Sequence, residues 1–177
     1  MSEDDRAGEF GPIYLPALQR IRDLWLELEP LVNATSYDDV VAPTELQISL
    51  SDGLGDAESA RLDIQWSELG MYSFHYVDSD DINWRFDRHP NSHSPETHFH
   101  PPPDAATTAA EPSCIDVTEV SLVSRAVHAM WRAAYDDVIG ELLEARQAIE
   151  RRDLAERMRE VDEMDSDEFV PLDAGAE

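Results

Sequence analysis

The sequence predicts an α+β fold, in which an N-terminal helix and a long C-terminal helix accompany an antiparallel four-stranded meander. Two kinds of periodicity lead to this prediction. Apolar residues recur every three or four positions near both ends of the chain, as on one face of a helix, whereas between residues 46 and 87 they alternate with polar residues, as in half-buried strands. With 177 residues and 42% hydrophobic content, the chain is long enough to bury a core as one domain.

The chain is expected to begin with a disordered segment, residues 1–11, which is acidic and contains glycine. A helix should follow from about Pro12 to Leu28, because apolar residues recur there with helical spacing. Pro16 suits the first turn of this helix. Residues 33–43 are rich in turn-forming residues and are expected to form a loop.

Four segments alternate between apolar and polar residues and are expected to form the sheet. They are residues 46–50, 62–66, 71–77 and 82–87. Short turn-rich segments separate them, as in a meander of hairpins.

The last of these hairpins permits a prediction of register. A three-residue turn would place Tyr72, Phe74 and Tyr76 on one face with the apolar residues of segment 82–87, whereas a four-residue loop would place them with the polar ones. Because a slip of one residue inverts every side chain, burial of the core favours the three-residue turn. The opposite face would then gather the polar residues Ser73, His75, Asn83, Arg85 and Asp87.

The C-terminal helix is expected to open at Asp116-Val-Thr-Glu119, which resembles a capping box, and its first half should pack on the sheet. Beyond Gly140 the helix becomes heavily charged. This half could dimerise or bind a partner helix, or it could be a solvated helix with internal ion pairs; both interpretations stay open. The folded domain is expected over residues 12–160, and residues 161–177 form an acidic tail that we expect to be disordered.

The chain carries 39 acidic and 13 basic residues, a net charge of −26, and all 13 basic residues are arginine. This composition is typical of a halophile's cytoplasmic protein, since concentrated salt screens the repulsion among carboxylates. The same screening weakens the usual argument that an acidic protein does not bind nucleic acid. The single cysteine, Cys114, excludes an intrachain disulfide and a cysteine-based zinc site. We expect neither an export signal nor a membrane span, and a cytoplasmic location.

Residues 82–103 concentrate the groups that can carry chemistry. A strand bearing Arg85 and Asp87 leads into a proline-punctuated, histidine-rich loop. Four of the six histidines lie in this stretch: His89, His93, His98 and His100.

Three interpretations of the stretch compete. His98-x-His100 with Asp87, His89 or His93 could ligate a metal ion. Alternatively, the histidines could transfer protons without a metal while Arg85 neutralises phosphate charge, as ribonucleolytic cleavage requires. In the third interpretation the stretch is an ordinary polar surface loop. We favour the metal-free site and therefore expect no cofactor, with a divalent metal left open.

The same stretch resembles the TumE-like toxins of toxin–antitoxin systems. Arg85-Phe86-Asp87 matches an Arg-aromatic-Asp core, Pro90 matches a following proline, and His98 and His100 match a later histidine-rich element. The resemblance spans Leu46 to Pro103. It implies a small α+β toxin suspected of ribonuclease activity and neutralised by a cognate antitoxin.

Together these observations favour a TumE-like ribonuclease toxin. Arg85 would stabilise the transition state, Asp87 would orient a histidine, and His98 or His100 would act as acid or base, with His89 and His93 in reserve. RNA and a cognate antitoxin are the expected partners, a membrane is not, and a homodimer through the C-terminal helix is possible. The alternatives are a non-catalytic interaction protein built around that helix and a metal-dependent hydrolase.

Overall fold

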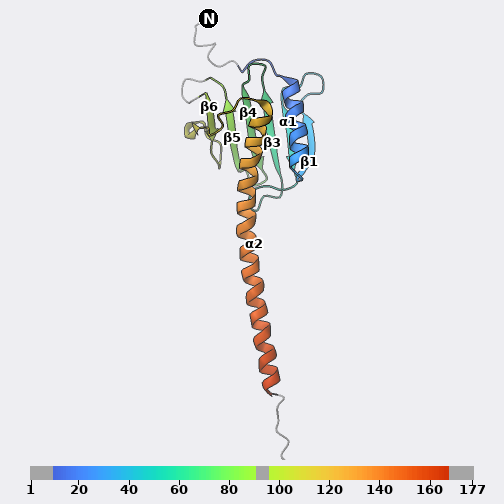
Figure 1. Cartoon of the computed structure of the whole chain (residues 1–177), viewed down its shortest axis with the longest axis vertical. Coiled ribbons are helices and arrows are strands. Elements are labelled where there is room, and N and C mark those ends of the chain that lie inside the picture. Colours follow the sequence, from blue (N-terminus) through green and yellow to red (C-terminus); the bar gives the residue numbers. More distant parts are fainter. Residues whose placement is uncertain (1–9, 91–95, 168–177) are drawn as a thin grey trace, which may run out of the picture. The chain divides into compact units, whose positions relative to one another are not determined.

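The computed structural model describes residues 10–90 and 96–167. The chain divides into two compact units, Met1–Tyr135 and Asp136–Glu177, which we describe separately. The first unit holds one sheet, the helix α1 (Leu15–Leu28), the short 3-10 helix η2 (Thr107–Ala109) and the beginning of the helix α2 (Val120–Asp167) (Figure 1). The strands are β1 (Val32–Tyr37), β2 (Leu46–Leu50), β3 (Ala60–Trp66), β4 (Tyr72–Asp78), β5 (Asn83–Arg88), β6 (Thr97–His100) and β7 (Glu111–Pro112).

The α+β class and both helices are confirmed, but the sheet has seven antiparallel strands in sequence order, not four. The four expected strands are β2 to β5. β1 lies in the segment expected to be a loop; most of its side chains are small or polar and face solvent, so apolar alternation does not mark it. β6 lies in a segment that was expected to be a loop. Its two buried positions are histidines, so the segment lacks the apolar residues that indicate a buried strand.

The predicted register between β4 and β5 is confirmed. Phe74 pairs with Phe86 and Tyr76 with Trp84, so the aromatic side chains share one face. The Asp78 N–H donates to the Ile82 carbonyl at 3.1 Å, which closes a three-residue turn whose last residue, Asp81, has a φ of 62°.

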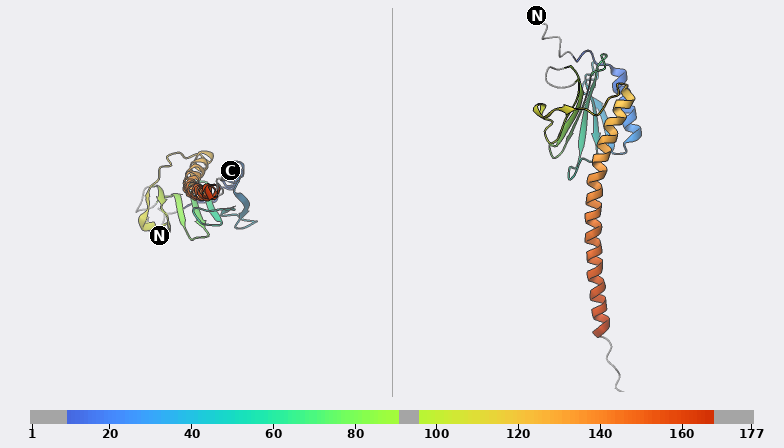
Figure 2. Two further views of the ribbon diagram at one scale, coloured as in Figure 1. Left: turned by 90° about the horizontal axis from the view of Figure 1, so that it is seen from below. Right: turned by 60° about the vertical axis from the view of Figure 1, so that its left-hand side comes forward.

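α1 and the beginning of α2 cover the aromatic face of the sheet, and neither of these two helices lies on the polar face (Figure 2). α1 buries Leu18, Ile21 and Trp25, and the start of α2 buries Val127 and Trp131. The Trp25 and Trp131 rings lie 6.1 Å apart.

A buried carboxylate joins the two helices. Glu29 follows α1 and accepts hydrogen bonds from His128 Nε2 at 3.0 Å and Arg132 Nη1 at 3.2 Å, both on α2. Each oxygen of the carboxylate thus has a charge-assisted hydrogen bond from α2, and these bonds hold the end of α1 against α2.

α2 begins at Val120, three residues later than the capping box Asp116-Val-Thr-Glu119 would place it. Glu119, the residue before the helix, accepts the N–H groups of Ser121 and Leu122 with its carboxylate, at 3.0 and 2.9 Å, and therefore caps the helix. Burial of Ile115 holds the preceding segment against the core in a non-helical conformation.

In the second unit α2 continues to Asp167, so the first seven residues of the expected tail, 161–167, are helical. No glycine or proline interrupts the sequence between Gly140 and Pro171, which allows the helix to extend. Residues 1–9 and 168–177, where disorder was expected, lie outside the described residues. Among the described helices, none combines the length and apolarity needed to cross a lipid bilayer.

The two buried tyrosines of β4 provide a matched test of this core. Burial raises the pKa of Tyr72 to about 12, and no described residue gives its hydroxyl a hydrogen bond. The Tyr76 hydroxyl donates to Asp78 Oδ2 at 3.1 Å and accepts from the Leu54 N–H at 3.0 Å. We expect Tyr76→Phe to lower the free energy of unfolding at pH 7 by about 1–2 kcal/mol, and Tyr72→Phe by less than about 0.5 kcal/mol.

Tyr72→Phe should also differ from wild type in alkali. The folded-state pKa of Tyr72 lies above the unfolded value of about 10, so its stabilising effect is complete below pH 10 and is lost as the pH rises toward 12. Urea unfolding of Tyr72→Phe should therefore show a smaller loss of stability over this interval than wild type. Equal losses in both proteins would contradict the assignment.

Candidate active site

The sheet register assembles the site by placing polar residues in rows across four strands. One row runs from Gln65 on β3 through Ser73 on β4 and Asp87 on β5 to His98 on β6. The neighbouring row contains His75, Arg85 and His100. Both rows lie on the face without helices, as the predicted register requires.

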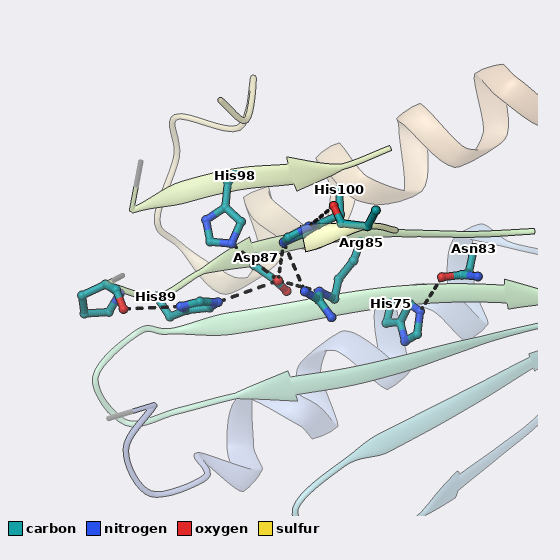
Figure 3. A network of polar contacts seen from close by, with 9 residues as sticks. His75, Asn83, Arg85, Asp87, His89, His98 and His100 are labelled. Atoms are coloured by element: carbon teal, nitrogen blue, oxygen red, sulfur yellow. Dashed lines mark hydrogen bonds and ion pairs between the residues drawn. The ribbon is translucent and has the colours of Figure 1, made fainter. Parts of the chain in front are cut away.

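Asp87 is the centre of this cluster (Figure 3). Arg85 Nε donates to Asp87 Oδ2 at 2.6 Å. The Nε2 atoms of His100, His98 and His89 lie 3.3, 3.6 and 3.8 Å from the same oxygen. Asp87 Oδ1 is buried and has no hydrogen-bond partner among the described residues.

His100 is held in a defined orientation. Its Nδ1 lies 3.3 Å from the Ala106 carbonyl oxygen, and Arg85 Nη2 lies 3.1 Å from its Nε2. Because a carbonyl oxygen only accepts, the proton of the neutral ring belongs on Nδ1, and the Nε2 lone pair accepts from Arg85.

The cluster is deeply buried on one side and open on the other. Asp87, His98 and His100 are at most 2% exposed, because the chain beyond β6 returns past this edge of the sheet. In this returning segment the Pro103 carbonyl accepts from the Asn83 N–H at 2.7 Å, and the Ala106 carbonyl contacts His100. The side chains of Arg85 and His89 remain about one third exposed. A shallow cavity of about 280 Å³ reaches the cluster; its lining residues are Phe10, Gln65, Ser73, Arg85, Asp87 and His89.

A larger cavity of about 420 Å³ lies on the opposite face and is lined mainly by apolar groups, among them Trp84, Phe99 and Trp131. It lacks a convergent set of charged groups that could transfer protons or neutralise charge. We therefore assign the candidate active site to the smaller polar cavity.

The structure brings together five of the six predicted site residues: Arg85, Asp87, His89, His98 and His100. The sixth, His93, lies outside the described residues. His98 and His100 are on strand β6, not in a loop. Gln65 was not among the predicted residues of this face, although its alternation with Ile64 and Trp66 is a signal that could have placed it there. Phe10 was missed because it falls in the segment expected to be disordered.

The arrangement supports two kinds of chemistry. Arg85 and His89 are accessible from the cavity and can bind an anion and transfer a proton. Behind them, Asp87, His98 and His100 offer three ligand atoms within 4.8 Å of one another, a set that could hold a metal ion.

Comparison with known proteins gives one finding. The protein-family model described as toxin TumE matches residues 19–139, more than half of the chain, from α1 into α2. The match includes the whole sheet and every residue of the cluster. No curated protein and no solved structure matches the chain.

The burial of Asp87 leads to a prediction of stability. Asp87→Ala leaves the guanidinium of Arg85 without its buried carboxylate partner, and we expect the free energy of unfolding to fall by about 3 kcal/mol. Asp63 is the matched control: it pairs with Arg61 at 2.7 Å on β3 with the same i, i+2 spacing, but its partner is 50% exposed. Asp63→Ala should cost less than about 1 kcal/mol. Urea denaturation of both variants measures the difference, and equal effects would contradict the central position of Asp87.

Proposed function

The chain belongs to the TumE family of toxins, and from that premise we propose that it is the toxin of a toxin–antitoxin system and that it acts by cleaving RNA. The observation that carries the ribonuclease proposal is the convergence of Arg85 and three histidines on the buried carboxylate of Asp87, beside an open cavity.

Arg85 is the group that we assign to the phosphate. Its guanidinium lines the cavity and is partly exposed, while its Nε is anchored to Asp87 at 2.6 Å. A planar guanidinium in a fixed position can neutralise the charge that develops on the phosphate oxygens when the ribose 2′-oxygen attacks phosphorus.

His89 is the histidine best placed to contact RNA, since it lines the cavity, whereas His98 and His100 are almost fully buried. Its Nδ1 lies 3.5 Å from the Pro90 carbonyl oxygen, an arrangement that leaves the lone pair of the neutral ring on Nε2. We assign to His89 the removal of the 2′-hydroxyl proton. As the 2′-oxygen bonds to phosphorus, the bond from phosphorus to the 5′-oxygen breaks, and water in the open cavity protonates the departing 5′-oxygen and leaves a 2′,3′-cyclic phosphate. His98 and His100, first expected to be acid or base, instead take the role of positioning Asp87 and Arg85.

The family also supplies the expected partner. A toxin of this kind is neutralised by a cognate antitoxin, which we propose as the protein partner of this chain. A homodimer through the charged half of α2 stays a proposal beside it. If the folded protein cleaves no RNA, the alternative is a non-catalytic interaction protein that acts through α2.

Cleavage of RNA in molar potassium chloride tests the ribonuclease. Arg85→Ala should lower the cleavage rate by about 10²- to 10³-fold, because it removes the charge that stabilises the transition state. The matched control is Arg61→Ala, which removes an arginine paired to an aspartate two residues on, on the same face of the sheet. This control should cleave like wild type. Equal loss in both variants, or no cleavage by folded wild type, would contradict the proposal.

His89→Ala should lower the rate by about 10²-fold or more if this side chain transfers the proton. His75 provides the control, since it lies on the same face but hydrogen-bonds Asn83 and not Asp87. Rates of both variants, measured on protein whose folding has been verified by circular dichroism, decide the assignment. A His89→Ala rate equal to that of His75→Ala would remove His89 from the mechanism.

A further inference from the structure

We propose that Asp87, His98 and His100 form a binding site for a divalent transition-metal ion such as Zn²⁺. Two imidazole nitrogens and a carboxylate are a donor set that suits zinc and other first-row ions. The three ligand atoms lie within 4.8 Å of one another, and all three residues are buried. This proposal concerns metal binding and does not depend on RNA being the substrate.

The pairing of two adjacent strands fixes the donors. Asp87 on β5 lies opposite His98 on β6, and His100 follows two residues later on the same face. Both histidines therefore approach the carboxylate from the same side (Figure 3). Donors on paired strands are held more firmly than donors on a loop, which favours a preformed site.

The two distances from the histidines to the carboxylate are closer to the spacing of ligands around a common ion than to direct hydrogen bonds. The Nε2 atoms of His100 and His98 lie 3.3 and 3.6 Å from Asp87 Oδ2. A charge-assisted N–H···O hydrogen bond would measure about 2.7–2.9 Å. Neighbouring ligands around a tetrahedral ion with bonds of about 2.0–2.1 Å are roughly 3.3 Å apart.

His100 also has the outer partner typical of a metal-bound histidine. Its Nδ1 faces the Ala106 carbonyl oxygen at 3.3 Å, which leaves the lone pair on Nε2, the atom that lies 3.3 Å from Asp87 Oδ2. A backbone carbonyl in this position fixes the tautomer and the ring orientation of the ligand.

A buried, unsatisfied oxygen indicates that a cation is needed here. Asp87 Oδ1 has no hydrogen-bond partner among the described residues, although the side chain is only 3% exposed. Leaving a carboxylate oxygen buried and unpaired is costly. A metal ion held by Oδ2 and the two imidazoles can also be bound by Oδ1 when the carboxylate is bidentate, which would satisfy this oxygen.

Arg85 competes with the ion for one ligand. Its Nη2 lies 3.1 Å from His100 Nε2, the atom that a metal would bind. The Arg85 side chain is 31% exposed and lines the cavity, so its Nη2 can release His100 while its Nε stays on Asp87. Removing this competing cation should therefore strengthen metal binding, which a purely structural hydrogen-bond cluster would not do.

The test is a titration of the full-length, chelator-treated protein with Zn²⁺ by calorimetry and with Co²⁺ by visible absorption, both in molar potassium chloride without RNA. We expect one ion per chain and the intense absorption of a tetrahedral Co²⁺ site with nitrogen ligands. His98→Ala/His100→Ala should weaken binding by about 100-fold or more, whereas His75→Ala should bind like wild type. Arg85→Met should bind about tenfold more tightly, and Arg61→Met should not.

The double variant can fail to fold, so X-ray absorption of the zinc-loaded wild type provides a second measurement. Two imidazole ligands per zinc would support the site. Absence of binding, a zinc spectrum with oxygen ligands alone, or unchanged affinity in the folded double variant would overturn it. If wild type binds the metal but cleaves no RNA, the ribonuclease proposal is contradicted and the metal-site proposal is not.

Discussion

The register between β4 and β5 is the constraint on which the rest of the molecule depends. The three-residue turn after Asp78 puts Phe74 opposite Phe86 and Tyr76 opposite Trp84, so the aromatic side chains form one face for the helices to cover. The same pairing puts Arg85 and Asp87 on the other face. A shift by one residue would bury the charges under the helices and expose the aromatic rings, so core formation and site formation are selected together.

A second constraint is the isolation of one carboxylate on the polar face. Most acidic residues whose burial the structure describes are at least partly exposed, but Asp87 is buried among Arg85 and the histidines. The low local dielectric strengthens the interactions of Asp87 with these partners. It also raises the free-energy cost of leaving a carboxylate oxygen without a donor or a cation. The net charge of −26 therefore says little about this site, where cationic and neutral donors surround a single anion.

Sequence reasoning was most successful where side-chain type and burial agree. The apolar alternation in β2 to β5 gave both the strands and the polar face. It failed at β6, since His98 and His100 occupy buried positions with polar side chains, and at β1, where backbone pairing to β2 stabilises a strand that buries little. The sequence pattern also could not predict the distances around Asp87, because these depend on residues 101–106, which return past β6.

The sequential order of the strands has a consequence for how the molecule forms. Every strand pairs with its immediate neighbour in the sequence, so each ladder closes a short loop and the sheet has no crossover. Loop-closure entropy is small for such contacts, and topologies rich in them fold faster than those with distant pairings. Contacts such as that of Glu29 with His128 span 99 residues and carry the larger entropic cost. The hairpin that bears the reactive groups can thus be assembled locally, before the helices close over the opposite face.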